Sequence, residues 1–438
     1  MEKGGAMKIN IYRLNELSPE QKKKIIARSE IDISDVAAGV KTILDDIKAR
    51  GDTAVIHYVK KIDGVDLSGR PFRVTEAEFE EAAAGISREV KEAIQYAVEN
   101  VTAVHKTQLP EAMTFKAVRP GLFAGERALP IPSAGLYVPR GKGSFPSMMY
   151  MMAIPAVVAG VERIPVVSPP DKEGKVDPGT LYAAQVCGLT EVYRIGGPMA
   201  VAALAYGTES ISPVGKIVGP GNAYVTTAKR LLAGIVDIGL PAGPSDSAII
   251  ADEKADPFKV ALDLILEAEH GSDSSSVLVT PSEKLAADVA AALPGLVADL
   301  SAERARYVSD VMAGYGGIII TGTMQEAVDF VNEFAPEHLQ VNTADPFDLL
   351  ADIRHAGEIL LGEKSVFSLA NYAAGANAVL PTGGKARTYS PLSVRDFIKY
   401  SSVVYISEKG FRELAPRVIA LADYEGFEAH GAALRKRT

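Results

Sequence analysis

Two pairs of carboxylate and imidazole side chains are the residues of this sequence best suited to chemistry. Glu267 and His270 belong to a segment that starts with Asp256 and Pro257, a start that predicts one helix over 256–271. Residues three apart on a helix share a face, so this carboxylate and this imidazole could bind one metal ion. On spacing alone, a histidine that interacts with the last carbonyl groups of the helix is the more common arrangement.

Glu337 and His338 form the second pair. They follow Pro336, which ends a helical pattern and predicts that the next residues lie in a loop. A neutral histidine can remove a hydroxyl proton near pH 7, and a carboxylate of raised pKa can activate water. Taken alone, such a pair is more often a solvated turn. The histidines without a neighbouring carboxylate are interpreted as surface or structural residues: His57, His105 and His355.

Two glycine-rich turns could bind phosphate, at residues 141–144 (Gly-Lys-Gly-Ser) and 219–222 (Gly-Pro-Gly-Asn). Each opens a helical pattern, where free backbone N–H groups and the helix dipole attract anions. Neither turn completes the usual dinucleotide fingerprint. A tight turn without a ligand is therefore an equal alternative.

The elements that must position these residues are parallel sheets. From about residue 134, short β-branched runs alternate with longer helical runs, a pattern typical of βα units with helices on both faces of a sheet. The runs form two sets, which predicts two sheet domains. The predicted strands are 135–139, 163–170, 191–197 and 215–221 in the first set, and 247–252, 275–281, 316–321 and 358–362 in the second.

The two ends of the chain have helical patterns. Capping boxes at 18–21 and 75–78 predict helices that begin near residues 19 and 76. After about residue 393 the pattern is again helical, with few strand-like runs, and the basic residues 435–437 are interpreted as a solvated end.

Composition excludes several classes of function. The chain has 438 residues, 47% hydrophobic and 23% charged, which suits a soluble globular protein of two or three domains. A net charge of −9 with scattered basic residues argues against nucleic acid and membrane surfaces as partners, so small-molecule chemistry is expected. The single cysteine, Cys187, and a start without an apolar core predict a cytoplasmic location.

Seven segments together resemble the histidinol dehydrogenase family in their order and over nearly the whole chain: GLYVP, IVGPGNAYV, DIGLPAGPSD, EAEHGSDSS, NEFAPEHLQV, NYAAGANAVLPTGG and Glu425-x-x-x-x-His430. The resemblance implies a homodimer with an active site shared between chains. It implies an N-terminal tail (1–33), a first Rossmann-like domain with the metal and catalytic residues (34–136 and 246–392), a second that binds NAD (137–245), and a helical tail that reaches the partner (393–438).

The resemblance also assigns roles. It implies Zn²⁺ and NAD as cofactors, His338 as the base that takes the alcohol proton, and Glu337 as the group that prepares water for oxidation of the aldehyde. The implied zinc ligands are Glu267, His270, Asn371 and, from the other subunit, His430. The implied NAD contacts are Tyr137, Met199 and Asn222, and the implied substrate contacts are Ser245, Glu267, His270, His338, Asn371, Glu425 and His430.

The sequence departs from the family at four positions, three of which are among the residues just named. The family usually has Gln where Glu267 stands and Asp where Asn371 stands, so one negative charge has moved and none is lost. Two histidines, a carboxylate and an amide oxygen still suit zinc, and we expect the metal to be kept. Met199 stands where the family has Gln, and any hydrogen bond made there is lost or replaced.

The fourth departure is Ala378, where members that oxidise histidinol carry a substrate-holding His. Losing such a partner costs about 1 to 3 kcal/mol, a roughly ten- to hundredfold weaker complex. Arg140, Lys142 and Arg395 could instead hold an anionic group, or meet NAD or solvent. The pattern resembles the sulfopropanediol dehydrogenases and predicts oxidation of 2,3-dihydroxypropane-1-sulfonate to sulfolactate. The alternatives are oxidation of L-histidinol and a non-catalytic homologue that binds NAD or a metabolite.

Overall fold

The computed structural model describes residues 7–28, 34–140 and 143–437. Its larger sheet has six parallel strands in the order β1-β10-β9-β8-β11-β12. The strands are β1 (Ile11–Arg13), β8 (Asp246–Ala251), β9 (Ser275–Thr280), β10 (Gly317–Ile320), β11 (His338–Asn342) and β12 (Glu358–Leu361). Most positions of these strands are buried, as expected when helices cover both faces.

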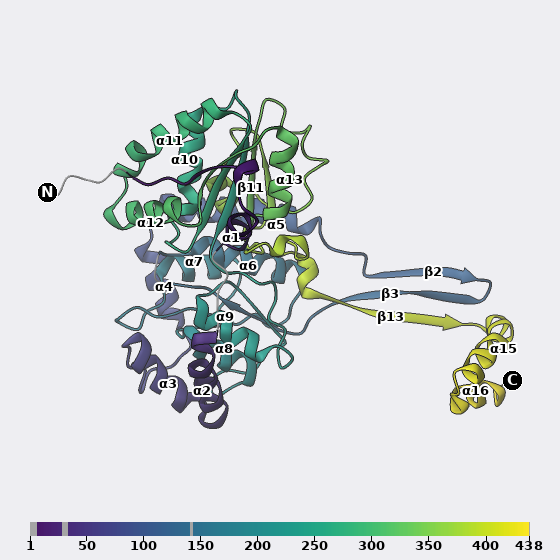
Figure 1. The fold of residues 1–438 in the computed structure, drawn as a ribbon. Helices are drawn as coiled ribbons and strands as arrows, with labels where there is room; N and C mark the ends of the chain where they lie inside the picture. Colours follow the sequence, from purple (N-terminus) through teal and green to yellow (C-terminus); the bar gives the residue numbers. More distant parts are fainter. Residues whose placement is uncertain (1–6, 29–33, 141–142, 438) are drawn as a thin grey trace.

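Alternate residues of the central strands face different helices. Ile249, Leu278 and Ile318 pack against one set, α10 (Pro257–Ala268), α11 (Glu283–Ala298) and α12 (Ala302–Ala313). Ile250 and Ile319 pack on the opposite face, against α13 (Met324–Phe334). The two-residue period of a strand gives each face its own apolar core. This lobe therefore has three layers, visible at the top of Figure 1.

The smaller sheet has four parallel strands in the order β6-β5-β4-β7. The strands are β4 (Ala134–Tyr137), β5 (Val166–Val167), β6 (Val192–Tyr193) and β7 (Lys216–Val218). One face is covered by α6 (Pro146–Ala159) and α7 (Pro178–Val186), and the other by α8 (Gly197–Tyr206) and α9 (Ala223–Leu232). Two separate parallel sheets, as the alternating pattern predicted, are thus present.

The helices between residues 34 and 106 pack against the helices that cover the smaller sheet. Helices α2 (Ser34–Arg50) and α3 (Asp52–Tyr58) share an apolar core with α8 and α9, while α4 (Glu76–Gly85) and α5 (Arg88–Lys106) pack on α7 and α6. The prediction that grouped 34–136 with the larger sheet is therefore wrong for these helices. Their apolar faces were visible in the sequence, but the partner of each face was not.

Residues 1–33 were predicted as a tail, yet Ile11–Arg13 pairs with β10 as an edge strand of the larger sheet. Helix α1 (Pro19–Ala27) begins at the predicted capping box of Ser18, and α4 begins at that of Thr75. Among the described residues, no helix is both long and apolar enough to cross a membrane.

A long antiparallel arm leaves the two lobes, as Figure 1 shows. It consists of β2 (Met113–Arg119), β3 (Leu122–Pro130) and β13 (Ile398–Ile406), and its end carries α15 (Glu408–Tyr424) and α16 (Glu428–Arg435). The expectation of a helical tail after residue 393 is wrong for 398–406, which form a strand. The strand forms because β3, distant in the sequence, supplies its hydrogen-bonding partners.

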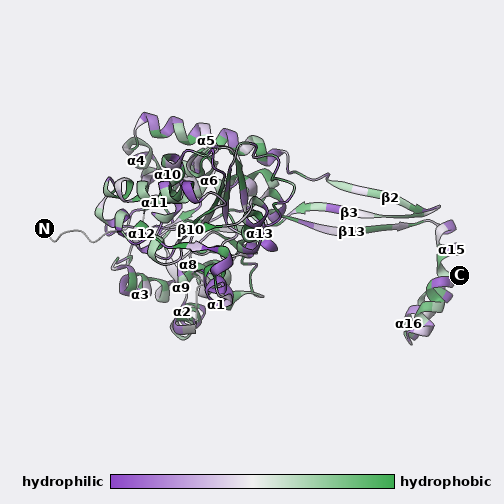
Figure 2. Ribbon diagram, turned by 45° about the horizontal axis from the view of Figure 1, so that its top comes forward, coloured by the Kyte–Doolittle hydropathy of each residue, from purple (hydrophilic) through white to green (hydrophobic). Residues whose placement is uncertain are grey.

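Both faces of the arm carry side chains open to solvent. Every residue of β2 is exposed, as are several large apolar side chains at the far end: Val404, Tyr405, Leu421, Tyr424 and Phe427. Figure 2 shows hydrophobic residues along the arm and its terminal helices. An unpaired apolar surface of this kind is typical of a protein–protein contact.

Candidate active site

The two predicted pairs lie together at the amino ends of β8 and β11. Helix α10 runs opposite to the strands it covers, so its last turn, with Glu267, reaches this edge of the sheet. The helix ends at Ala268 rather than at 271, and His270 lies in the turn beyond it. His338 is the first residue of β11, which corrects the prediction of a loop at this place. The strand is possible because the proline lies two residues earlier.

Glu267 is the centre of the cluster and is fully buried. Its Oε2 lies 3.0 Å from Nδ1 of His270, and its Oε1 accepts a hydrogen bond of 2.8 Å from Nδ2 of Asn371. Asn371 is supplied by α14 (Phe367–Tyr372). Ser245 contacts the same ring nitrogen of His270, with 3.1 Å between its Oγ and Nδ1. Four of the predicted residues are thus in contact within one chain.

His338 faces this cluster through Nε2. That atom lies 3.6 Å from Oε1 of Glu337 and 3.9 Å from Oε2 of Glu267. The other ring nitrogen, Nδ1, is 2.5 Å from Oε1 of Glu358. Because Glu358 occupies Nδ1, the ring orientation is fixed and Nε2 is the atom available to a substrate proton.

Burial and charge shift both catalytic candidates. Burial raises the pKa of Glu337 to about 8, although His338 opposes the shift. Burial lowers the pKa of His338, but the carboxylates of Glu267, Glu337 and Glu358 outweigh it and raise this pKa to about 10. A buried carboxyl group of raised pKa beside a histidine is typical of general acid–base sites, and the two groups exchange protons as a pair.

Asp246 holds the backbone of the catalytic pair. Its Oδ1 accepts a 2.8 Å hydrogen bond from the backbone N–H of Glu337, while its own N–H donates to Oε2 of Glu337 at 3.1 Å. Arg28, almost fully buried, pairs with Asp246 at 2.9 Å and donates to the carbonyl oxygens of Phe334 and Ala335. Ala335 has a φ of 49°, a left-handed conformation that costs energy without glycine. Arg28 and Asp246 thus stabilise the strained turn that presents Glu337.

The predicted NAD residues lie at the carboxyl edge of the smaller sheet. Tyr137 ends β4, and Asn222 follows β7. The chain reverses its strand order between β4 and β7, and ligands of open parallel sheets bind at such a switch point. Asn222 caps α9 by accepting from two backbone N–H groups, whereas Met199 is fully buried and presents no side-chain surface to a ligand.

The glycine-rich turn at this switch point has a structural requirement for glycine. Gly219 has a φ of +126°, and a Cβ there would lie 2.1 Å from the carbonyl oxygen of Tyr137. Its own carbonyl accepts a 3.1 Å hydrogen bond from the buried ammonium of Lys229. The other predicted turn includes Gly141 and Lys142, which lie outside the described residues.

Two predicted site residues are not brought to the cluster within one chain. Glu425 directly follows α15 and His430 lies in α16, and both residues are exposed. Figure 1 shows these two helices at the end of the arm, far from the lobes. Of the cations considered, Arg140 donates to the carbonyl of Lys175 and pairs with Asp171, so it is already engaged. Arg395 is exposed on a short 3₁₀ helix, Val394–Phe397.

Sequence reasoning missed Glu358, Asp246 and Arg28. Glu358 begins a predicted strand, and its pairing with His338 follows once β11 and β12 are known to be parallel neighbours. Asp246 directly follows Ser245 in the PAGPSD segment, which was a usable signal. No feature of the sequence marked Arg28, since its position near the site depends on the path of the N-terminal segment.

His105 was interpreted as a surface or structural residue. It is buried and hydrogen-bonded to Val101 and Asn377, which agrees with a structural role.

An α/β protein with parallel sheets and an acid–imidazole cluster is the class that this geometry defines. The family model for histidinol dehydrogenase matches residues 26–438. The chain is 49% identical over 427 residues to the histidinol dehydrogenase of Synechocystis sp., with 98% of each covered, and 45% identical over 428 residues to a histidinol dehydrogenase homolog of Colwellia psychrerythraea, with 98% and 96% covered. The crystal structure of histidinol dehydrogenase from Elizabethkingia anophelis matches with a TM-score of 0.92 and 34% identity, covering 98% of both chains.

The chain therefore belongs to the histidinol dehydrogenase family. This membership makes it an NAD-dependent oxidoreductase that acts on a CH–OH group, and it implies NAD and zinc as cofactors.

The residues of the cluster fit a zinc ion. Oδ1 of Asn371 is buried without a hydrogen-bond partner, and the buried Oε2 of Glu267 has only Nδ1 of His270 beside it, at 3.0 Å. Such an arrangement is costly for polar atoms unless a cation satisfies them. His270 adds an imidazole whose side chain is 45% exposed and so remains accessible. Among the described residues, no three His, Cys, Asp or Glu side chains gather as a metal site. One chain thus offers three of the four donors that zinc usually takes, one of them an amide.

Proposed function

We propose that this protein oxidises L-histidinol to L-histidine in two NAD-dependent steps at the cluster around Glu267 and His338. The observation that carries the proposal is the contact of the buried His338–Glu358 pair with Glu337 and Glu267. The 49% identity to a relative named histidinol dehydrogenase favours histidinol over the sulfonate predicted from the sequence.

In this reaction the neutral form of His338 accepts the hydroxyl proton at Nε2, while Glu358 holds the ring through Nδ1. A zinc ion held by Glu267 would favour this neutral form, because its charge opposes the carboxylates that raise the pKa of His338. Glu337 then holds and moves a proton for the water that hydrates the aldehyde, because burial keeps its carboxyl group able to exchange a proton near neutral pH. Zinc, when bound, orients and polarises the substrate hydroxyl. Glu267, His270 and Asn371 would hold it.

We also propose that the fourth zinc ligand is His430 of a second copy of this chain, and that Glu425 of that copy approaches the substrate. Two observations support a shared site. Both residues are exposed at the end of a projecting arm, and the described residues of one chain bring only three donors together, Glu267, His270 and Asn371. The smaller sheet would then bind NAD at the carboxyl ends of its strands, and the larger sheet would hold the substrate at the amino ends of β8 and β11.

Mixing two inactive variants tests the shared site. His338→Ala and His430→Ala chains are each expected to be inactive, since each removes one essential group from every site. After unfolding and refolding together, half of the dimers are mixed, and one of their two sites has both histidines. We expect about a quarter of the wild-type activity in the mixture. No recovery, with mixed dimers demonstrated by a size tag, would exclude a site built from two chains.

A second candidate substrate is 2,3-dihydroxypropane-1-sulfonate, favoured by Ala378 at the place of a substrate-holding histidine. Steady-state assays with both alcohols decide between them. A kcat/KM that is higher for L-histidinol by tenfold or more supports the proposal, and the reverse order supports the sulfonate. If neither alcohol, nor any of a panel of small primary alcohols, yields NADH with zinc present, a non-catalytic binding role gains support.

A further inference from the structure

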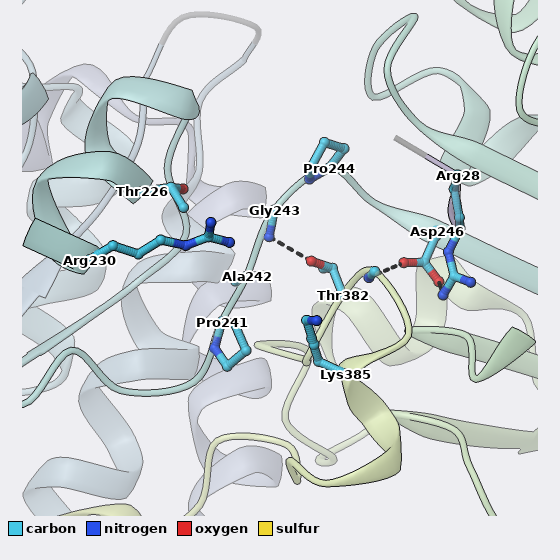
Figure 3. Close-up of a pocket in the computed structure, with 11 residues that line it drawn as sticks. Arg28, Thr226, Arg230, Pro241, Ala242, Gly243, Pro244, Asp246, Thr382 and Lys385 are labelled. Atoms are coloured by element: carbon cyan, nitrogen blue, oxygen red, sulfur yellow. Dashed lines mark hydrogen bonds and ion pairs between the residues drawn. The ribbon is translucent and has the colours of Figure 1, made fainter. Parts of the chain in front are cut away.

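A cavity of about 230 Å³ lies between the two sheet lobes, beside the candidate active site but not part of it. Its walls come from α9 of the smaller-sheet lobe and from the segments 241–246 and 382–385. Three cationic residues line it, Arg28, Arg230 and Lys385, against one carboxylate, that of Asp246. Figure 3 shows Arg230 and Lys385 entering the cavity from different walls.

Only two of these cations remain available for a ligand. Arg28 is paired with Asp246 and bonded to backbone carbonyls, and the two oxygens of Asp246 accept from Glu337 and Gly383. Within the described part of the chain, Arg230 and Lys385 form no ion pair. The cavity therefore has an excess of two positive charges that the protein itself does not neutralise.

The cavity borders both functional regions. Pro244 and Asp246 line it, while Ser245 between them contacts His270 of the zinc cluster. On the other wall, Thr226 and Arg230 lie on α9, the helix that Asn222 caps at the edge assigned to NAD. The cavity therefore lies next to both regions.

We propose that Arg230 and Lys385 form a binding site for a tetrahedral oxyanion, a phosphate or sulfonate group carried by a ligand of the dehydrogenase. The inference rests on the proposed function for the identity of that ligand, which is either the pyrophosphate of the dinucleotide or the acid group of an anionic alcohol. Guanidinium and ammonium groups on facing walls suit such an anion, the first through paired N–H donors and the second as a point charge.

The experiment uses full-length protein and the variants Arg230→Gln and Lys385→Met, with Lys23→Met as the matched control. Lys23 is an exposed lysine on α1 outside the cavity. Calorimetry without turnover measures the binding of ADP-ribose, which carries the pyrophosphate but no nicotinamide, and of inorganic pyrophosphate. Steady-state assays then give KM for NAD, L-histidinol and 2,3-dihydroxypropane-1-sulfonate. Arg230→Lys, which keeps the charge but loses the planar donor pair, is the conservative variant.

If the dinucleotide supplies the anion, each neutral variant weakens ADP-ribose and pyrophosphate binding about 10- to 100-fold, with Arg230→Lys intermediate and the control unchanged. If the alcohol supplies it, ADP-ribose binding is unchanged, and KM rises for the sulfonate but not for histidinol. Unchanged dinucleotide binding together with unchanged KM values overturns the proposal. If the wild-type protein shows no dehydrogenase activity with either alcohol, the proposed function is refuted instead. Calorimetry would still measure the binding of ADP-ribose and pyrophosphate at this site.

Discussion

Glu358 offers the sharpest test of how the catalytic histidine is held. Its carboxylate is 6% exposed and lies 2.5 Å from Nδ1 of His338. A hydrogen bond to a charged group contributes about 1.5 to 3 kcal/mol, so Glu358→Ala should lower kcat about 10- to 150-fold. Glu358→Gln keeps a hydrogen-bond acceptor but removes the charge, and the hydrogen bond loses about half of its energy. This variant should lower kcat about 3- to 12-fold.

The pH dependence separates this role from simple packing. The charge of Glu358 is among those that raise the pKa of His338, so its removal lowers this pKa. The histidine is then neutral, and able to accept a proton, at a lower pH. We expect the acidic limb of the kcat/KM profile to move to lower pH in Glu358→Gln.

The assay is NADH formation from L-histidinol over a range of pH, with zinc content and melting temperature measured for each variant. Leu360→Ala, in the same strand but facing a helix layer, serves as the control for disturbed packing. The reasoning fails if Glu358→Gln leaves both kcat and the acidic limb at wild-type values. It also fails if the control lowers kcat as strongly as Glu358→Ala.

Three further predictions follow from the same contacts. Ala378→His should lower KM for L-histidinol about 10- to 100-fold if this position limits binding, and an unchanged KM would remove it from the substrate site. Asn371→Ala should reduce bound zinc, measured by metal analysis after dialysis, because it deletes one donor; chelation should abolish activity and added zinc should restore it. Arg28→Met should lower the free energy of unfolding in urea by about 3 to 5 kcal/mol, since Asp246 stays buried without its partner. Adding Asp246→Asn should recover part of this loss, and a loss below about 1 kcal/mol would contradict the role of the pair.

The sequence alone determined the local structure in much of the chain. Capping residues gave correct helix starts at Pro19, Glu76 and Pro257, because a cap acts over one turn and needs no distant partner. The alternation of β-branched and helical runs gave both parallel sheets, since burial on two faces leaves an apolar signature in each strand.

Strands that depend on remote pairing were not determined in this way. The arm strands β2, β3 and β13 contain no buried residue, so they carry no buried pattern. The sequence of β13 was therefore interpreted as part of a helical tail. Edge strand β1 has only three residues. Their existence is decided by hydrogen bonds to strands far away in the sequence, which local propensity cannot supply.

The same distinction between local sequence and remote contacts applies to the candidate site. Residue types and family motifs marked Glu267, His270, Glu337 and His338, whose chemistry is visible in one dimension. Only the tertiary structure decided their support. Parallel pairing of β11 with β12 sets Glu358 against His338, and the path of the N-terminal segment sets the buried Arg28 against Asp246. Such contacts arise where separate elements pack, so the energy that fixes them belongs to the fold rather than to any segment.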